Sequence, residues 1–435
     1  MVRKIRLKVH IIFPSRALSV YRFKKVVKSA KILIFLQKQL DIMNTIDNIS
    51  FHGERVVIRV DYNVPFDDQN RITDTTRIQS SKETISIVLK NGGSVVLLTH
   101  LGRPKGVDLN LSCSLIVDEV SKILDHKVLF CPSTIGEEAE NMSKSLRPGE
   151  IMLMENVRFY SQETKGEIAF AKELSKLGTV YVNDAFGVAH RAHSSTTIIT
   201  QFFDNKYFGK LLEKEVRSID KVINNGKKPI LAILGGAKIS SKITIIESLL
   251  DSVNDILIGG GMAYTFIKAQ GGSIGNSICE IDFCDYALEL IQKAKEKGVQ
   301  IYLPMDVIIA DSFNNSANRK VAFVNQIPEG WQGLDFGPES IENIKPLIEK
   351  SKTILWNGPL GVFEFDNFSK GTIALGELIS DATSKGAFSL VGGGDSVAAV
   401  KKFGLSNKMS YVSTGGGAML ESLEGKKLPG IEALM

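Results

Sequence analysis

Charged and hydrogen-bonding side chains gather after short apolar runs in the first half of the chain. Asp61 and Asn63 follow the run at 56–60 and, being two residues apart, project to the same side of an extended segment. Arginine gives bidentate contacts to phosphate or carboxylate, so arginines near Asp61 and Asn63 predict a site for a small, multiply charged anion with a hydroxyl group. Any one arginine could equally be a solvated surface side chain, and only their convergence carries the prediction. The residues concerned are Asp61, Asn63, Arg77, His100, Leu101, Gly102, Arg103, Arg158, His190 and Arg191.

Glycine dominates the corresponding turns of the second half. Bare backbone amides at a helix N-terminus bind anions, and Lys238 and Lys242, four residues apart, add point charges. Asp395 stands beside glycines and suits Mg²⁺, which takes one or two carboxylates plus phosphates. One such turn would be weak evidence because glycine also ends helices, but five in one half predict a nucleotide-binding site. The glycine-rich turns lie at 235–236, 259–261, 357–361, 392–394 and 415–417.

Two common nucleotide motifs are absent. The sequence has no GxxxxGK[ST] loop and no GxGxxG after an apolar run, which argues against P-loop enzymes and dinucleotide dehydrogenases. The triplet Asp335-Phe336-Gly337 spells the metal motif of protein kinases, but no HRD loop precedes it and no lysine stands in a VAIK context. We therefore interpret this triplet as a chance match.

Parallel strands would bring these turns together. From Met43 onward, short apolar runs alternate with helical patterns, and the runs lack the strict alternation of half-exposed strands. Because ligands bind beyond the carboxyl ends of parallel strands, we expect an α/β fold with two doubly wound, Rossmann-like parallel sheets joined by a helix over 211–223. The expected strands lie at 56–60, 95–98, 127–130, 151–154 and 180–182, then at 230–234, 256–258, 299–303, 353–356, 388–391 and 411–412.

Helix boundaries are marked by caps and glycines. Thr164 and Glu167 predict a capping box for a helix over 167–177 that Gly178 ends. Glycines also separate a helical pattern from the next strand at Gly92, Gly298 and Gly386. These signals support the alternation of helices and strands.

The composition is that of an ordinary globular protein. The chain has 435 residues, of which 43% are hydrophobic and 23% charged, which excludes wholesale disorder, collagen and a polytopic membrane protein. A chain of this length normally forms two or more cores. The four cysteines show no Cys-x-x-Cys and no zinc spacing, so we expect free thiols in a reducing cytosol.

The formal net charge of +5 is unevenly distributed. Residues 1–42 hold eleven Lys/Arg and one acid, a net of +10, whereas the other 393 residues hold 42 bases and 47 acids, a net of −5. The charge therefore predicts neither a nucleic-acid nor a membrane partner for the body of the chain. The basic segment could be an organelle-targeting or membrane-surface segment, or sequence upstream of a start at Met43. We favour Met43 because a well-patterned domain begins there.

The residues alone thus predict a Mg-nucleotide domain facing an anion domain, which is a small-molecule phosphotransferase that closes to exclude water. The strings that carry this prediction resemble the phosphoglycerate kinase family over essentially all of 43–435. They occur in family order and are VVIRVDYNVP (56–65), THLGRP (99–104), ENVRF (155–159), NDAFGVAHRAHSS (183–195), GGAKISSK (235–242), GGGMAYTF (259–266), WNGPLGVFE (356–364), GGGDS (392–396) and STGGGA (413–418).

The resemblance implies reversible phosphoryl transfer between MgATP and the carboxylate of 3-phosphoglycerate. It implies that Arg77 and Lys242 act on the transferred group and that the anion-binding residues above hold the phosphoglycerate. It also implies a cytoplasmic monomer with a hinge between its domains and no nucleic-acid or membrane partner. The ATP/ADP contacts that it implies are Gly236, Lys238, Lys242, Gly260, Gly333, Asn357, Glu364, Gly392, Gly393, Gly394, Asp395 and Ser396, with Asp395 as the Mg²⁺ ligand.

Domain boundaries follow from the same reasoning. We expect a basic extension at 1–42, a 3-phosphoglycerate-binding domain at 43–210 and the joining helix at 211–223. A Mg-nucleotide domain would cover 224–415, and a segment at 416–435 would return to the first domain.

One departure from the resemblance concerns the metal. Many relatives have Asp where this chain has Ser241, which puts a direct metal contact at that position in doubt. Two other hypotheses stay open at this point: a scaffold whose basic extension docks on anionic lipid or nucleic acid, and another acyl-phosphate kinase. The intact set of candidate catalytic residues argues against the scaffold hypothesis. Another acyl-phosphate kinase would not share the THLGRP and VDYNVP strings.

Overall fold

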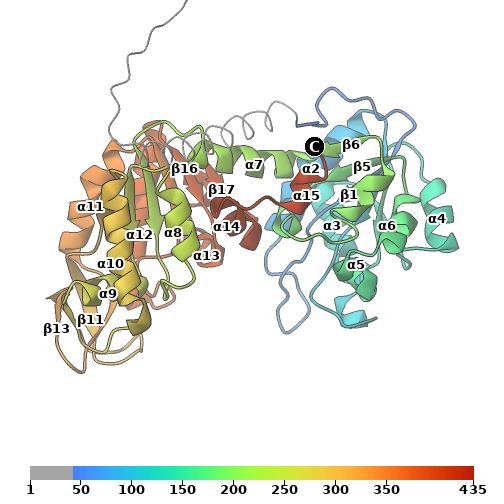
Figure 1. Cartoon of the computed structure of the whole chain (residues 1–435). Coiled ribbons are helices and arrows are strands. Elements are labelled where there is room, and N and C mark those ends of the chain that lie inside the picture. The colour runs from blue at the N-terminus through green and yellow to red at the C-terminus, as the bar shows by residue number, and fades with distance from the viewer. Residues whose placement is uncertain (1–42) are drawn as a thin grey trace, which may run out of the picture. The chain divides into compact units, whose positions relative to one another are not determined.

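The structure, a computed structural model, describes residues 43–435, and the basic extension at 1–42 lies outside the described residues. The described chain contains two six-stranded parallel sheets whose strands alternate with helices (Figure 1). Many of these strands are buried along their whole length, which explains why their sequences do not alternate. The predicted fold class, with two doubly wound parallel sheets, is confirmed.

The first sheet has the strand order β3-β4-β2-β1-β5-β6, with every neighbouring pair parallel. Arg59 at the end of β1 pairs with Leu98 of β2 and with Asn183 of β5, so three carboxyl ends are level. Asp61 and His100 each lie two residues beyond a paired position and therefore share one edge of the sheet. The strands are β1 (Arg55–Arg59), β2 (Ser94–Leu98), β3 (Val128–Cys131), β4 (Ile151–Met154), β5 (Val180–Asn183) and β6 (Lys206–Phe208).

Sequence patterning predicted five of these strands and missed β6. This strand has three residues, begins with a lysine and lies at the edge of the sheet, so it presents no apolar run to recognise. The first half therefore has six strands rather than the expected five.

The second sheet has the order β10-β8-β7-β15-β16-β17, again parallel throughout. Leu234 of β7 pairs with Asn357 of β15 and with Ile258 of β8, so the glycine-rich turns after these strands begin at one edge. All six expected strands are present. They are β7 (Ile230–Leu234), β8 (Asp255–Ile258), β10 (Gln300–Tyr302), β15 (Thr353–Asn357), β16 (Phe388–Val391) and β17 (Tyr411–Val412).

Two small sheets were not predicted. One is antiparallel with the order β12-β11-β14, and the other is the pair β13-β9. Strand β12 is mostly exposed and β13 and β9 have two residues each, so these three lack the buried apolar run used as the signal. Strand β11 does carry such a run, with Val307, Ile309 and Ala310 buried, and it was not assigned from the sequence. The strands are β9 (Ser273–Ile274), β11 (Asp306–Ala310), β12 (Arg319–Phe323), β13 (Gln326–Ile327) and β14 (Gln332–Phe336).

The helices follow the expected alternation, with one corrected boundary. The predicted capping box at Thr164 is wrong, because Thr164 belongs to the separate helix α5 and its hydroxyl donates to the Ser161 carbonyl. Helix α6 begins after Glu167, which makes no side-chain cap. The helices are α2 (Thr76–Lys90), α3 (Val117–Leu124), α4 (Glu137–Lys144), α5 (Ser161–Lys165), α6 (Ile168–Ser175), α7 (Lys210–Ile223), α8 (Ile243–Leu249), α9 (Met262–Ala269), α10 (Cys284–Glu296), α11 (Pro338–Lys350), α12 (Lys370–Ser384), α13 (Gly394–Lys402), α14 (Gly417–Leu423) and α15 (Pro429–Glu432).

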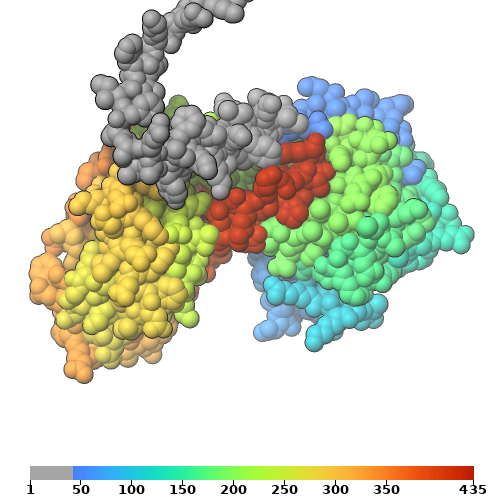
Figure 2. All heavy atoms as spheres, in the orientation of Figure 1, coloured from blue at the N-terminus to red at the C-terminus, as the bar shows by residue number. Residues whose placement is uncertain are grey.

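Helix α7 is tied to the end of the second sheet by a buried carboxylate. Glu215 is fully buried and accepts hydrogen bonds from Ser413 Oγ at 2.8 Å and from the Thr414 backbone N–H at 2.7 Å. Burial raises the pKa of Glu215 to about 7. Farther on, the Gly430 N–H donates to the Ala189 carbonyl at 2.9 Å, so the red C-terminal segment of Figure 2 contacts the first half.

Each large sheet has its own buried core. Val56, Ile58 and Leu97 belong to the first, and Trp356 and Leu231 to the second. All four cysteines are free, as expected. Within residues 43–435, no helix is long and apolar enough to cross a membrane.

Candidate active site

Asp61 is the centre of the cation cluster at the edge of the first sheet. Its Oδ2 accepts a hydrogen bond from Arg77 at the start of α2, and its Oδ1 lies 3.9 Å from Nδ1 of His100. Oδ1 is buried and has no hydrogen-bond partner among the described residues. A buried acceptor without a partner is costly, so Asp61 Oδ1 can accept a hydrogen bond from a hydroxyl group of a ligand.

A glycine leaves room for this arrangement. A Cβ atom at Gly187 would lie 2.4 Å from Asp61 Oδ2 and 3.4 Å from Arg77 Nη1. Any side chain there would displace the Asp61–Arg77 pair. The glycine of the NDAFG string is therefore required by the close approach of these two side chains.

Asn63 and Arg158 are joined through the backbone of the turn after β2. Asn63 Oδ1 accepts from the Gly102 N–H at 2.8 Å, and Arg158 Nη1 donates to the Gly102 carbonyl at 2.8 Å. Arg158 lies in the 3₁₀ turn Val157–Phe159 after β4, and burial lowers its pKa to about 10. Leu101 is fully buried and its carbonyl accepts from Asn156 Nδ2, so Leu101 can offer a ligand only its backbone.

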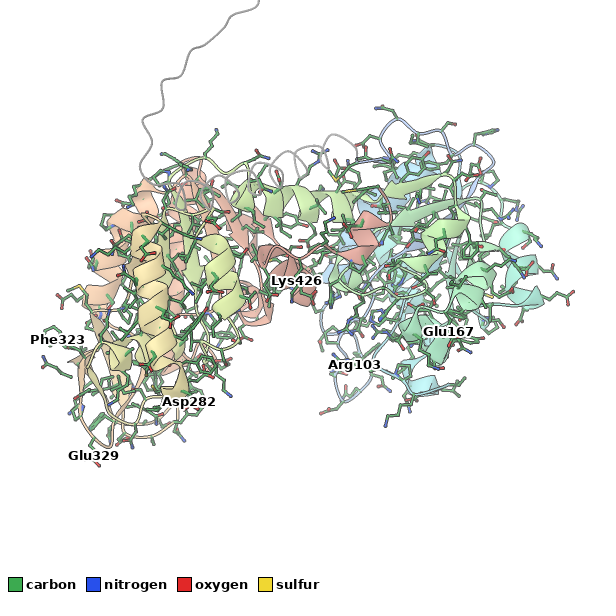
Figure 3. The ribbon with its side chains drawn as sticks, in the orientation of Figure 1. Arg103, Glu167, Asp282, Phe323, Glu329 and Lys426 are labelled. Atoms are coloured by element: carbon green, nitrogen blue, oxygen red, sulfur yellow. The ribbon has the colours of Figure 1, made fainter. Side chains whose placement is uncertain are left out.

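The remaining predicted residues of the first half are more exposed. Arg103 extends from the loop after β2 into solvent (Figure 3). Arg191 is exposed and its Nε donates to His190 Nε2 at 3.2 Å. His190 Nδ1 has no partner among the described residues, and burial lowers the pKa of His190. The structure thus joins Arg77 to Asp61 by a hydrogen bond, places His100 within 3.9 Å of Asp61, and leaves Arg103 exposed.

The site residues assigned from the sequence leave out three buried residues behind this cluster. Arg59 is fully buried at the end of β1, and its Nε donates to Ser195 Oγ at 2.7 Å. Ser195 Oγ lies 2.6 Å from Glu163 Oε1, and Glu163 is also fully buried. Arg59 and Ser195 stand inside the quoted strings VVIRVDYNVP and HRAHSS, but no spacing rule distinguishes a buried arginine from a solvated one.

The glycine-rich turns of the second sheet line a cavity of about 390 Å³. Its volume lies within the usual range for ligand sites. Five predicted nucleotide contacts line it, namely Gly236, Gly260, Gly333, Glu364 and Asp395. Apolar and aromatic walls that the sequence did not reveal come from Tyr264, Ile278, Phe313, Leu360 and Val362.

Phe313 and Gly333 show how this cavity is shaped. Phe313 is 62% exposed although it is a large aromatic side chain. A sequence does not show whether such a side chain is exposed or belongs to a core, so no sequence signal singled it out. A Cβ atom at Gly333 would lie 1.9 Å from the Tyr264 hydroxyl, so only glycine fits beside that ring. A flat ligand could lie between such walls.

Lys242 is held by Asn357 across two strand ends. Lys242 precedes α8, and its Nζ donates to Asn357 Oδ1. Asn357 Nδ2 in turn donates to the Gly392 carbonyl at 2.7 Å. Burial lowers the pKa of Lys242, while Asp395 opposes that shift as a neighbouring negative charge.

The N-terminus of helix α13 is the last part of the candidate site in the second half. Ser396 is fully buried and its Oγ accepts from the Gly358 N–H at 2.5 Å. Gly393 has φ 91°, and a Cβ atom there would lie 2.5 Å from Asn357 Nδ2. Asp395 lies in the first turn of α13 and, like Gly394, is exposed. The helix N-terminus and its preceding glycines thus remain open to an anion.

Lys238 and Ser241 lie on the surface turn before α8. The Ser241 hydroxyl donates to the Lys238 carbonyl at 2.9 Å. Within residues 43–435, no group of three or more His, Cys, Asp and Glu side chains could hold a metal by itself. A metal at this site would therefore need oxygen ligands from the phosphates in addition to Asp395.

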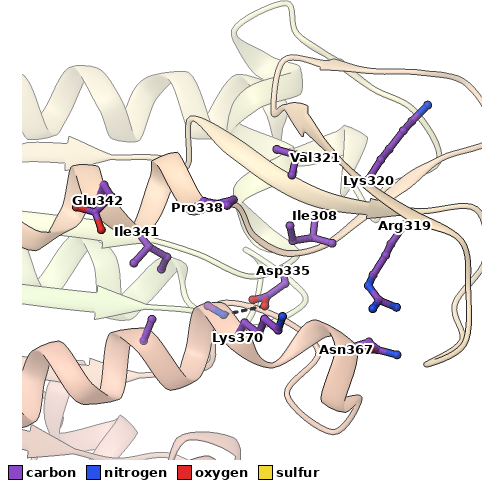
Figure 4. Close-up of a pocket in the computed structure, with 12 residues that line it drawn as sticks. Ile308, Arg319, Lys320, Val321, Asp335, Pro338, Ile341, Glu342, Asn367 and Lys370 are labelled. Atoms are coloured by element: carbon purple, nitrogen blue, oxygen red, sulfur yellow. Dashed lines mark hydrogen bonds between the residues drawn. The ribbon is translucent and has the colours of Figure 1, made fainter.

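A second cavity, of about 470 Å³, lies outside the predicted site. It is bordered by β11, β12, β14, α11 and α12, and no predicted site residue lines it (Figure 4). Asp335 of the Asp-Phe-Gly triplet contributes to this wall, and its Oδ2 accepts from the Gly371 N–H at 2.8 Å. This carboxylate caps helix α12, which is a structural role unrelated to the kinase motif.

Comparisons with known proteins extend over nearly the whole described chain. The family model described as "Phosphoglycerate kinase" matches residues 46–426. A phosphoglycerate kinase of Porphyromonas gingivalis is 48% identical over 415 residues, which cover 90% of this chain and 99% of that relative. "Phosphoglycerate kinase 3, cytosolic" of Arabidopsis thaliana is 49% identical over 392 residues, covering 90% and 98%. The solved structure of phosphoglycerate kinase from Coxiella burnetii superposes with a TM-score of 0.83 at 39% identity, covering 90% of this chain and 98% of that one.

Proposed function

This chain belongs to the phosphoglycerate kinase family, and we propose how its residues carry out the reaction of that family. The activity is reversible phosphoryl transfer between ATP and the carboxylate of 3-phosphoglycerate, which gives 1,3-bisphosphoglycerate and ADP in glycolysis and gluconeogenesis. The observation that carries the residue assignment is the unpartnered Oδ1 of Asp61 among cations at the edge of the first sheet.

The first half holds 3-phosphoglycerate. Asp61 and Asn63 take its hydroxyl group, because Asp61 Oδ1 is a buried acceptor with no other partner. Arginine forks suit its phosphate and carboxylate groups, and Arg158 is anchored for this purpose by the Gly102 carbonyl. The other contacts are His100, Leu101, Gly102, Arg103, His190 and Arg191.

The second half holds ATP. The base lies between the apolar walls near Gly333, and the ribose lies toward Glu364, both of which line the cavity. The phosphates lie at the start of α13, where backbone amides and the helix dipole favour negative charge. The contacts are Gly236, Lys238, Lys242, Gly260, Gly333, Asn357, Glu364, Gly392, Gly393, Gly394, Asp395 and Ser396.

Mg²⁺ fits this half. Asp395 and Glu364 are the acidic residues that line the cavity, and a single aspartate plus phosphate oxygens is a usual magnesium environment. We assign Asp395 as the protein ligand, since Ser241 directs its hydroxyl to its own turn. Bound Mg²⁺ would neutralise charge on the nucleotide phosphates.

The chemistry needs positioning and charge neutralisation more than a protein nucleophile. A carboxylate oxygen of 3-phosphoglycerate attacks the γ-phosphorus of ATP, and the bond from that phosphorus to the β-phosphate oxygen breaks. Arg77 and Lys242 offset the charge on the transferred group, each being held by one acceptor until the ligand arrives. This role accounts for the partial burial of both Arg77 and Lys242.

Several wider properties accompany this proposal. The domains would be 43–210 and 224–415, joined by a helix at 211–223, with 416–435 returning to the first domain and 1–42 forming the extension. Hinge bending would bring the ATP and 3-phosphoglycerate sites together and exclude water. The enzyme would be a cytoplasmic monomer whose partners are its two small-molecule substrates.

A coupled assay tests the proposal. We expect ADP formation that requires both ATP and 3-phosphoglycerate and that stops when Mg²⁺ is chelated. Arg158→Gln should raise the KM for 3-phosphoglycerate and leave the KM for ATP nearly unchanged. Equal effects on both substrates would contradict the assignment of Arg158 to the phosphoglycerate site.

A further inference from the structure

A fully buried guanidinium lies directly behind the anion-binding cluster. Arg59 has no solvent exposure, and its Nε donates to Ser195 Oγ at 2.7 Å. Its Nη1 donates to the carbonyl oxygens of Val60 and Leu98. Its Nη2 lies 3.1 Å from Nδ1 of His100. Arg59 is therefore placed by four acceptors, one of which is a ring nitrogen of a substrate-site residue.

The contact between Arg59 and His100 has only one possible direction. A guanidinium carries donors and no acceptor, so Nδ1 of His100 must accept. An accepting Nδ1 bears no proton. In a neutral imidazole the proton then resides on Nε2, which fixes the tautomer of His100.

The surroundings of His100 favour this neutral ring. Burial, together with the positive charges of Arg59, Arg158 and Arg77 and the nearby His193, lowers the pKa of His100 well below its usual value. Asp61 is the carboxylate that faces the ring, and it would favour a proton on Nδ1. Its Oδ1 is 3.9 Å away, beyond hydrogen-bond range, whereas Arg59 lies at 3.1 Å.

Two further residues hold Arg59 in place. Ser195 Oγ receives the Arg59 Nε–H and has one proton of its own, which it donates to Glu163 Oε1 at 2.6 Å. The Ser195 N–H donates to the other oxygen, Glu163 Oε2, at 2.9 Å. Glu163 is fully buried, and its charge compensates that of Arg59 through the shared serine.

We propose that Glu163, Ser195 and Arg59 are positioning residues that fix His100 as the Nε2–H tautomer, so that His100 presents a neutral N–H donor to 3-phosphoglycerate. Among the described residues, Nε2 of His100 has no hydrogen-bond partner. It is also absent from the set of unpartnered atoms that are shielded from solvent, so a ligand can reach it. A neutral donor keeps the same hydrogen-bonding capacity throughout the physiological pH range. The inference rests on the proposed role of His100 in binding phosphoglycerate.

The tautomer is directly measurable in the full chain. Protein labelled with ¹⁵N-histidine is examined by two-bond ¹H–¹⁵N correlation NMR without substrate, and His100→Gln identifies the His100 signals among the six histidines. We expect a pyridine-like Nδ1 and a pyrrole-like Nε2 that do not titrate between about pH 5.5 and 8. A protonated Nδ1, a mixture of tautomers or titration within that range would overturn the proposal.

A pair of neighbouring serines tests the positioning chain. Ser195→Ala leaves Arg59 Nε and Glu163 Oε1 without their partner, so we expect roughly a tenfold rise in the KM for 3-phosphoglycerate with the KM for ATP within about twofold. Ser195→Thr, which keeps the hydroxyl, should restore the wild-type value. Ser194→Ala is the control, because Ser194 is equally buried but its Oγ donates to the carbonyls of Gln162 and Glu167.

The outcomes separate the inference from the function on which it rests. Equal effects of Ser195→Ala and Ser194→Ala, or an equal rise in both KM values, would overturn the positioning role. If His100→Gln leaves the KM for 3-phosphoglycerate unchanged, the substrate role of His100 fails even when the spectrum shows the expected tautomer. Folding of each variant is checked by its circular dichroism and melting temperature.

Discussion

The two halves of this molecule present different groups at the edges of their large sheets. The first half uses charged side chains that already bond to one another, as in the Asp61–Arg77 pair and the buried Arg59–Ser195–Glu163 chain. The second half presents backbone amides in glycine-rich turns, with the ammonium of Lys242, which Asn357 holds, beside them. A fixed set of donors and acceptors suits one small substrate, whereas backbone amides suit the repeated phosphates of a nucleotide.

Removing Arg77 should have the largest effect. Arg77→Ala leaves Asp61 Oδ2 without its donor and, in the mechanism that we propose, removes a cation from the transferred group. We expect kcat to fall about 10²–10³-fold, with ATP affinity changed little, because Arg77 belongs to the first half. Steady-state kinetics and calorimetric ATP titration measure both. Arg71→Ala is the control, since Arg71 is an exposed arginine paired with Asp67. Near-normal turnover in Arg77→Ala would remove it from the catalytic set.

Removing Lys242 should have the next largest effect. Lys242→Ala takes away the partly buried ammonium that Asn357 holds, so we expect kcat to fall about 10²-fold. Single-turnover kinetics distinguish a slower transfer step from weaker binding. Lys268→Ala, which removes an exposed lysine on α9, should behave as wild type. A loss confined to the KM for ATP would assign Lys242 to binding alone.

Adding a single methyl group at Gly393 should affect the binding of ATP without affecting the binding of 3-phosphoglycerate. Gly393→Ala would place a Cβ atom 2.5 Å from Asn357 Nδ2 at a φ of 91°, a combination that strains the turn before α13. We expect the KM for ATP to rise about tenfold and the KM for 3-phosphoglycerate to stay the same. Gly404→Ala is the control, because Gly404 also has a positive φ but a Cβ atom there would meet no atom within 4 Å. If both KM values rose together, the halves would not be independent.

The smallest predicted change concerns the metal. Ser241→Asp would add a carboxylate to the turn that precedes α8, and we expect the Mg²⁺ concentration for half-maximal activity to fall about threefold, since more charged ligands strengthen binding. Ser241→Asn has similar size without the charge and should leave this concentration unchanged. Titration of activity with Mg²⁺ at fixed ATP measures the effect. Identical curves for the two variants would exclude a role for charge at this position.

Much of this architecture could be predicted because buried parallel strands leave a strong signal. Runs such as 230–234 and 388–391 coincide with β7 and β16, and the turns after them hold the expected residues. Exposed or very short strands such as β12 and β9 gave no signal because they bury little apolar surface. The capping box at Thr164 failed because a separate helix, α5, uses that residue.

The residues of the candidate site likewise divide into those with a signal in the sequence and those without one. Residues in glycine-rich or charged turns could be proposed from the sequence because their types are unusual after a strand. Phe313 and Tyr264 were missed because an apolar wall looks like core in a sequence. Arg59 and Glu163 were left out of the assigned site for another reason, since only three-dimensional contact shows that their charges are buried and compensated. A sequence thus suggests candidate ligand-binding groups more readily than it suggests the buried groups that hold those candidates in place.

The two hydrogen bonds of the Asn357 side chain bear on how the proposed ATP site is preorganised. One amide uses its oxygen for Lys242 and its nitrogen for the Gly392 carbonyl, so it joins a cation to the backbone that precedes α13. Part of the conformational entropy of the lysine is therefore already lost in the protein without ligand. In the ATP-binding mode that we propose, a phosphate would exchange the hydrogen bond from Lys242 to Asn357 for a stronger one. The cation is preorganised by a neutral acceptor, which holds its direction without cancelling its charge.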